Sequence, residues 1–66
     1  MTDNQLAFYQ ELGKLPKKIH KKLVSRIKEL EYLEPKLSEI AGDIILSEGL
    51  EFEEAFELAL HDFYLD

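Results

Sequence analysis

Apolar residues recur at spacings of three and four along most of the chain, and glycine and proline separate the segments in which they do so. The breaks fall at Gly13, Pro16, Pro35 and Gly49. Residues three and four apart share one face of an α-helix, whereas a half-buried strand alternates apolar and polar residues. No segment follows the strand pattern. The pattern predicts an all-α fold, a small bundle or array of about four short helices in a single domain over residues 1–66.

The first predicted helix covers residues 4–12, with Asp3 as its N-cap and Gly13 at its C-terminal end. Its inward side chains are Leu6 and Tyr9, with Phe8 and Leu12 as further candidates. The second predicted helix covers residues 16–33, because Pro16 suits a first helical turn. It carries the most regular stripe, formed by Ile19, Leu23, Ile27 and Leu30, with Val24 and Leu33 at the margins.

The third predicted helix covers residues 36–48, because Pro35 disfavours helical geometry at Glu34 and itself suits a helix start. One long kinked helix is the alternative. The inward stripe of the third helix is Leu37, Ile40, Ala41, Ile44 and Ile45. Gly49 permits a left-handed turn before a fourth helix over residues 51–64. The stripe of that helix is Phe52, Ala55, Phe56, Ala59, Leu60 and Phe63.

Charge is distributed very unevenly along the 66 residues, whose formal net charge is -6. Residues 14–28 hold seven of the eight basic residues and no acidic one, whereas residues 29–66 hold twelve acidic residues and one basic one. The second helix therefore presents a wide basic face opposite its apolar stripe. We take that face as a candidate contact surface, formed by Lys17, Lys18, Lys21, Lys22 and Arg26.

A basic helix can bind phosphates, so a nucleic-acid-binding module that uses residues 14–28 is the first alternative function. The acidic helices would repel the same backbone within a Debye length of ~10 Å, and no aromatic or amide side chain stands among the lysines to contact bases. These features disfavour nucleic acid as a partner. We expect the basic face to be solvated, or to lie against acidic helices of the same chain or of a second copy.

Four apolar residues fall outside the predicted stripes. They form a candidate apolar interface of Leu46, Leu58, Tyr64 and Leu65. Isolated exposed apolar residues are normal, but a chain of this size has a limited core, so these residues indicate burial against another protein or in a homo-oligomer, and self-association is the interpretation slightly favoured.

The sequence offers little for catalysis. It has no cysteine, few hydroxyl side chains and two histidines far apart, and it lacks glycine-rich phosphate loops and metal-ligand motifs. His20 is interpreted as a histidine at a helix boundary. Glu57 and His61, four residues apart, are interpreted as an intrahelical pair, with half of a metal or enzyme site as the less favoured alternative. We therefore expect no enzyme, no catalytic site, no bound metal and no cofactor.

The remaining expectations concern function and location. The acidic segment could imitate the phosphates of DNA, so an acidic DNA mimic or inhibitor is the second alternative function. No stretch approaches the ~18 apolar residues of a membrane span, the apolar stripe of the basic helix lacks a tryptophan anchor, and the first residues do not resemble a signal peptide. We expect a cytoplasmic, non-enzymatic protein-binding or regulatory module that acts through apolar surface framed by charged faces, without membrane contact.

Overall fold

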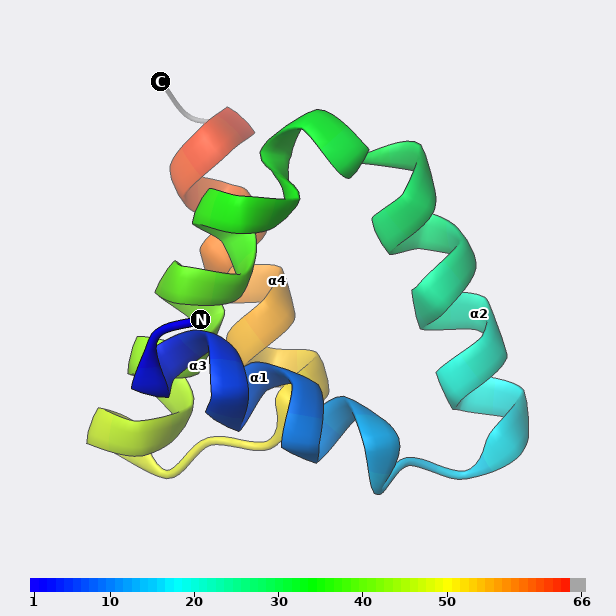
Figure 1. The fold of residues 1–66 in the computed structure, drawn as a ribbon, viewed down its shortest axis with the longest axis horizontal. Helices are drawn as coiled ribbons and strands as arrows, with labels where there is room; N and C mark the ends of the chain where they lie inside the picture. Colours follow the sequence, from blue (N-terminus) through cyan, green and yellow to red (C-terminus); the bar gives the residue numbers. More distant parts are fainter. Residues whose placement is uncertain (65–66) are drawn as a thin grey trace.

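The computed structural model describes the backbone of residues 1–64 and the side chains of residues 1–63. The elements are α1 (Asp3–Gly13), α2 (Lys17–Glu29), a single 3₁₀ turn η1 (Glu31–Leu33), α3 (Glu34–Glu48) and α4 (Phe52–Tyr64) (Figure 1). Residues 1–64 contain no strand, which confirms the predicted all-α class. The predicted first, third and fourth helices begin and end within two residues of the observed ones.

The first helix is capped by Thr2, so the prediction that Asp3 is its N-cap is wrong. Thr2 has extended geometry, its side-chain oxygen accepts from the backbone N–H of Gln5 at 3.1 Å, and its own N–H donates to Oε1 of Gln5 at 3.1 Å. This reciprocal pair satisfies two of the free N–H groups at the helix start. Asp3 instead lies in the first turn, where the helix dipole stabilises a carboxylate.

The inward face of α1 is formed by Ala7, Phe8 and Leu12, whereas Leu6 is 47% exposed. The prediction that Leu6 faces inward is therefore wrong, and the two further candidates, Phe8 and Leu12, are buried. The reason lies in how closely α1 approaches α3 at Asn4. Residues 4, 8 and 12 share a helix face, so this contact turns Phe8 and Leu12 into the core and Leu6 away from it.

The approach of α1 to α3 depends on Gly42. A Cβ at this position would lie 1.7 Å from the backbone oxygen of Asn4. Ser38, Ala41 and Gly42 are all buried, and their small side chains leave room for the backbone of α1. Polar contacts from the start of α1 reinforce the contact, since Asn4 donates to Glu39 at 3.0 Å and Thr2 also bonds Glu39.

The second helix ends four residues before the predicted end. Leu30 leaves helical geometry, with φ -104° and ψ 29°, and the turn η1 leads into α3. Glu34, expected to break the helix, is helical with φ -52° and ψ -46°. Pro35 lies in the first turn of α3, where its missing N–H needs no partner. The alternative of one long kinked helix is therefore not observed.

The core lies between α1, α3 and α4. Phenylalanine rings dominate it: the centroid of Phe8 is 4.9 Å from that of Phe52 and 6.5 Å from that of Phe56. Leu37 and Ala41 of α3 complete the centre of the cluster. Gly49, with φ 67°, makes the left-handed turn predicted between α3 and α4, a geometry that favours glycine.

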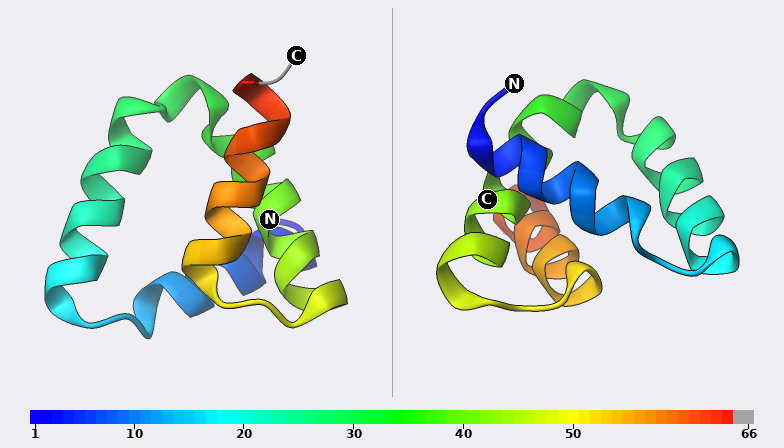
Figure 2. Two further views of the ribbon diagram at one scale, coloured as in Figure 1. Left: turned by 180° about the vertical axis from the view of Figure 1, so that it is seen from behind. Right: turned by 60° about the horizontal axis from the view of Figure 1, so that its bottom comes forward.

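The helix α2 lies at the edge of the molecule, beside the other three rather than among them (Figures 1 and 2). None of its residues is fully buried. Its apolar stripe reaches the core only with partly buried side chains, of Leu23, Val24 and Ile27. The element with the most regular amphipathic pattern therefore contributes least to the buried interior, and it leaves most of its surface open.

Candidate functional site

The predicted basic face lies on the outside of α2. Lys17, Lys18, Lys21, Lys22 and Arg26 are all exposed, as is Lys28. The structure therefore brings the five predicted residues together on one helix. None of these lysines forms an ion pair with a described residue; the ion pairs of residues 1–63 are Lys14–Glu11 at 2.9 Å and Arg26–Glu57 at 3.4 Å.

Arg26 differs from the lysines because it reaches across to α4. Its guanidinium carbon lies 5.7 Å from the centre of the Phe56 ring, and its Nη1 donates to Oε1 of Glu57. Among the side chains that the structure describes, Arg26 is thus the residue of the basic face that meets an acidic helix of the same chain. Charge alone does not distinguish Arg26 from the lysines, but the position of Arg26 beside the apolar stripe was a usable signal.

We expect Arg26→Ala to lower the free energy of unfolding by about 1–2 kcal/mol, because it removes an ion pair worth up to ~1 kcal/mol and a cation–π contact worth a further ~0.5–1 kcal/mol. Arg26 and Glu57 are well exposed, at 47% and 63%, so their ion pair contributes no more than that. Urea unfolding followed by circular dichroism measures it. Lys36→Ala, at an exposed lysine without a described ion pair, is the control, and equal stability of the two variants would show that Arg26 does not tie α2 to α4.

His20 and His61 have different surroundings. His20 is half-buried, and its Nδ1–H donates to the carbonyl oxygen of Leu12 at 2.9 Å, which links the start of α2 to the end of α1 and fits the boundary interpretation. The predicted Glu57–His61 pair is not formed. Glu57 pairs with Arg26 instead, and His61 has no ion pair among residues 1–63. Cross-helix attraction to a guanidinium has replaced the intrahelical pair.

Two shallow hollows of opposite charge lie on α2 and α4. The first, here called the α2 hollow, measures about 270 Å³ and is lined by His20, Lys21, Val24, Ser25 and Lys28. The second, here called the α4 hollow, measures about 450 Å³ and is lined by Glu53, Glu54, Glu57 and Leu58. Each combines an apolar side chain with charges of one sign.

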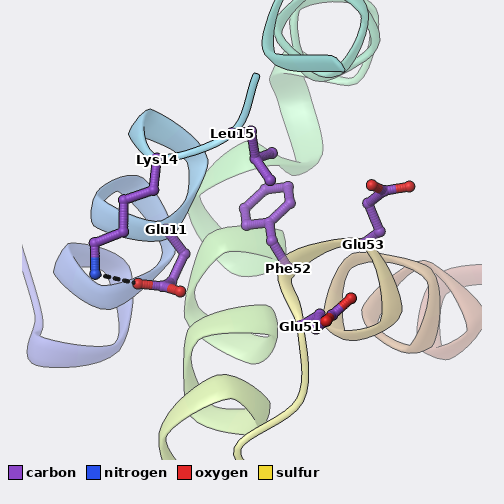
Figure 3. A pocket seen from close by; sticks show the side chains of 6 residues that line it. All are labelled: Glu11, Lys14, Leu15, Glu51, Phe52 and Glu53. Atoms are coloured by element: carbon purple, nitrogen blue, oxygen red, sulfur yellow. Dashed lines mark hydrogen bonds and ion pairs between the residues drawn. The ribbon is translucent and has the colours of Figure 1, made fainter. Parts of the chain in front are cut away.

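A third hollow, of about 260 Å³, lies between the end of α1 and the start of α4 (Figure 3). Leu15 and Phe52 are its apolar lining, and Phe52 is only 3% exposed. Glu11, Glu51 and Glu53 also line the hollow, and Lys14 pairs with the carboxylate of Glu11. With one carboxylate already paired and the aromatic ring covered, this hollow offers less free surface than the other two.

The candidate apolar interface is only partly described. Leu46 on α3 is 59% exposed and Leu58 on α4 is 46% exposed, so both are accessible as predicted. Leu58 lines the α4 hollow. The side chain of Tyr64 and the whole of Leu65 lie outside the described residues.

Among residues 1–63, no three His, Cys, Asp or Glu side chains are grouped so as to hold a metal ion, and the buried polar side chain is that of Ser38. None of the described helices is long and apolar enough to cross a membrane. No protein-family model, curated protein or solved structure matches the chain.

Proposed function

We propose that this protein is a non-enzymatic protein-binding module whose binding surface is the outer face of α2. The observation that carries the proposal is that α2 has a strongly amphipathic sequence and no fully buried residue. An amphipathic helix gains stability in water by burying its apolar face. The uncovered remainder of that face is what a partner would contact.

The charge of α2 supports a protein partner with an acidic surface. Lysines flank the stripe on both sides and make no ion pair with described residues, so they are free to attract carboxylates. Such complementarity favours rapid and selective encounter. Leu23, Val24 and Ile27 are only partly buried where they pack against the core, and the part of each that stays accessible would add apolar contact beside the lysines.

Nucleic acid fits this surface less well. The acidic side chains of α4 begin close by, as the Arg26–Glu57 contact at 3.4 Å demonstrates, and they would repel a phosphate backbone laid along α2. No aromatic side chain belongs to α2. We therefore expect weak, non-specific nucleic-acid binding at physiological salt.

A photo-crosslinking amino acid placed at Ser25 tests the proposal in the source cell. Ser25 is exposed and lies in the α2 hollow. We expect discrete protein adducts at this position, because a partner seated on α2 comes within reach of the reactive group. The same amino acid at Gln10, exposed on α1, is the matched control.

The adduct should also disappear when Lys21→Glu and Lys28→Glu are introduced beside Ser25. Adducts that are equal at Ser25 and Gln10 would contradict the proposed function. So would crosslinks to RNA or DNA, together with a mobility shift that weakens steeply with salt, because counterion release gives that pattern.

A further inference from the structure

The α2 helix carries lysines at positions that work against its own stability. Lys17 and Lys18 lie in its first turn, where a positive charge opposes the helix dipole, and no acidic residue or side-chain cap offsets them. Lys17 and Lys21 are four residues apart, as are Lys18 and Lys22, so like charges repel each other along the helix. Departures of this kind from the pattern of a stable helix are expected at functional surfaces. An acidic partner bound to α2 would relieve the repulsion.

Three of the basic residues form one row with an apolar residue. This lysine row consists of Lys17, Lys21, Val24 and Lys28. The spacings of four, three and four residues keep the row on one face of the helix. Arg26 lies on the opposite side of α2 and points to Glu57, so the row is turned away from the acidic helix α4.

The lysine row is open to a partner. Lys21, Val24 and Lys28 line the α2 hollow, and all the residues that line this hollow belong to α2 itself. The lysines of the row are exposed, and none forms an ion pair with a described residue. Val24 is half-buried and gives the row an apolar centre.

The helix that carries the row is fixed on two sides. His20 bonds the carbonyl oxygen of Leu12 at the end of α1, and Arg26 bonds Glu57 of α4. A preformed surface loses less conformational freedom on binding than a mobile one. The spacing of the charges along α2 is therefore set before a partner binds.

Building on the protein-binding function proposed above, we infer that the partner contributes an acidic helix, which lies along the lysine row. Two carboxylates on this helix are seven residues apart, as Lys21 and Lys28 are, and pair with those lysines. An aliphatic side chain between them, three or four residues from each, contacts Val24.

The spacing of the row favours a helix over an extended peptide. Lys21 and Lys28 are separated by about 10.5 Å along the helix axis, at 1.5 Å per residue, and Val24 lies between them. Residues seven apart on a partner helix span the same distance. On a strand, two carboxylates that flank one apolar residue on the same face are about 13–14 Å apart. A helix therefore keeps its charges in register with the row.

The partner is another protein rather than a second copy of this chain. No two of the fourteen acidic residues of this sequence are seven positions apart. On α4, the exposed Leu58 follows Glu54 by four residues, but the residue seven after Glu54 is His61. None of the helices of this chain therefore provides the complementary pattern.

Synthetic peptides test the acidic helix as partner. The probe is a labelled, alanine-based peptide of about 20 residues, long enough to form a helix, with glutamates seven residues apart and a leucine between them. The control peptide has the same composition, but its glutamates and leucines lie on different faces. Fluorescence anisotropy measures the dissociation constants. We expect the wild type to bind the control peptide at least about tenfold more weakly than the probe, because only the probe matches the row.

Two double variants of equal charge locate the binding site. Lys21→Glu with Lys28→Glu should weaken binding of the probe at least about tenfold, because both ion pairs become contacts between like charges. Lys18→Glu with Lys22→Glu is the matched control, since it changes the net charge equally on the same helix but outside the α2 hollow. It should weaken binding less than about threefold, because salt screens charges beside the contact. Circular dichroism checks that both variants are folded.

Equal binding of the two peptides, or equal weakening by the two double variants, would overturn the inference, because general charge attraction would then explain the binding. Absence of probe binding at about 1 mM would also overturn it. So would RNA or duplex DNA that binds the wild type more tightly than the probe does and is released by Lys21→Glu with Lys28→Glu.

The crosslinks from Ser25 separate this inference from the proposed function. Adducts with another protein, together with a probe that does not bind, would overturn the acidic helix and leave the proposed function standing. Adducts between two copies of the chain would overturn the other protein as partner. Absence of α2-specific protein adducts would contradict both the inference and the proposed function.

Discussion

Gly42→Ala is expected to destabilise the protein by about 3 kcal/mol or more, the upper part of the range for overpacked positions. The added Cβ would lie 1.7 Å from the oxygen and 2.4 Å from the carbon of the Asn4 carbonyl, and a backbone group cannot turn aside as a flexible side chain can. The α1 helix would have to move away from α3, opening the core around Phe8. A core of this size provides roughly 3–5 kcal/mol, so much of the protein should unfold.

Thermal and urea unfolding measured by circular dichroism test this expectation. Gly13→Ala is the matched control, because nothing lies within 4 Å of a Cβ at that position and Gly13 ends a helix without positive φ. It should leave stability unchanged or raise it by about 0.5–1 kcal/mol. If Gly42→Ala unfolds at the same urea concentration as Gly13→Ala, the close helix contact is not present in solution.

Phe56→Ala is expected to cost about 3–5 kcal/mol, the usual loss for a buried aromatic residue. The ring of Phe56 is 1% exposed and stacks at 5.9 Å on Phe52, and Arg26 lies over it. The truncation would therefore leave a cavity at the centre of α4 and also remove the ring that Arg26 contacts. We expect the helical signal to fall and the cooperative melt to disappear.

Leu58→Ala is the control for that experiment, because Leu58 lies two residues away on the same helix and is 46% exposed. Its effect should stay within about 0.5 kcal/mol, as for most surface substitutions. Phe56→Leu keeps most of the apolar volume and should lose less than Phe56→Ala. A melting temperature unchanged by Phe56→Ala would place that ring outside the core.

The spacing of apolar residues predicted where the helices lie in the sequence better than which face each helix turns to the core. The spacing of the fourth stripe correctly identified Phe52, Phe56 and Leu60 as buried. The same spacing wrongly favours Leu6 on α1, because a short helix with apolar residues on several sides does not define which side faces the core. The deciding contact comes from the backbone of Asn4 against Gly42, and small residues carry little hydrophobic signal.

Local signals explain the other differences at helix ends. Thr2 and Gln5, three residues apart, match the capping-box pattern, so the sequence contains a signal for a cap at Thr2 as well as for the predicted cap at Asp3. Pro35 was correctly associated with a helix start, but the interruption falls earlier, at Leu30. The constraint that proline places on the preceding residue is a preference, and Glu34 adopts helical geometry despite it.

The candidate site was only partly predictable for a related reason. The basic face is confined to one helix, so helical geometry alone placed its five residues together. The contact of Arg26 with Glu57 joins residues 31 positions apart and depends on where α4 lies relative to α2. Sequence spacing contains no direct information about that relation.

Because α2 lies at the edge of the molecule, its length can change with little effect on the entropy cost of folding the other three helices together. Because α1 packs directly on α3, residues 14–33 form a closed loop within the fold, and α2 is a structured part of that loop. The entropy cost of closing a loop rises only with the logarithm of its length. A helical turn added to or removed from α2 would thus change the reach of the exposed face while altering the cost of bringing α1 and α3 together very little.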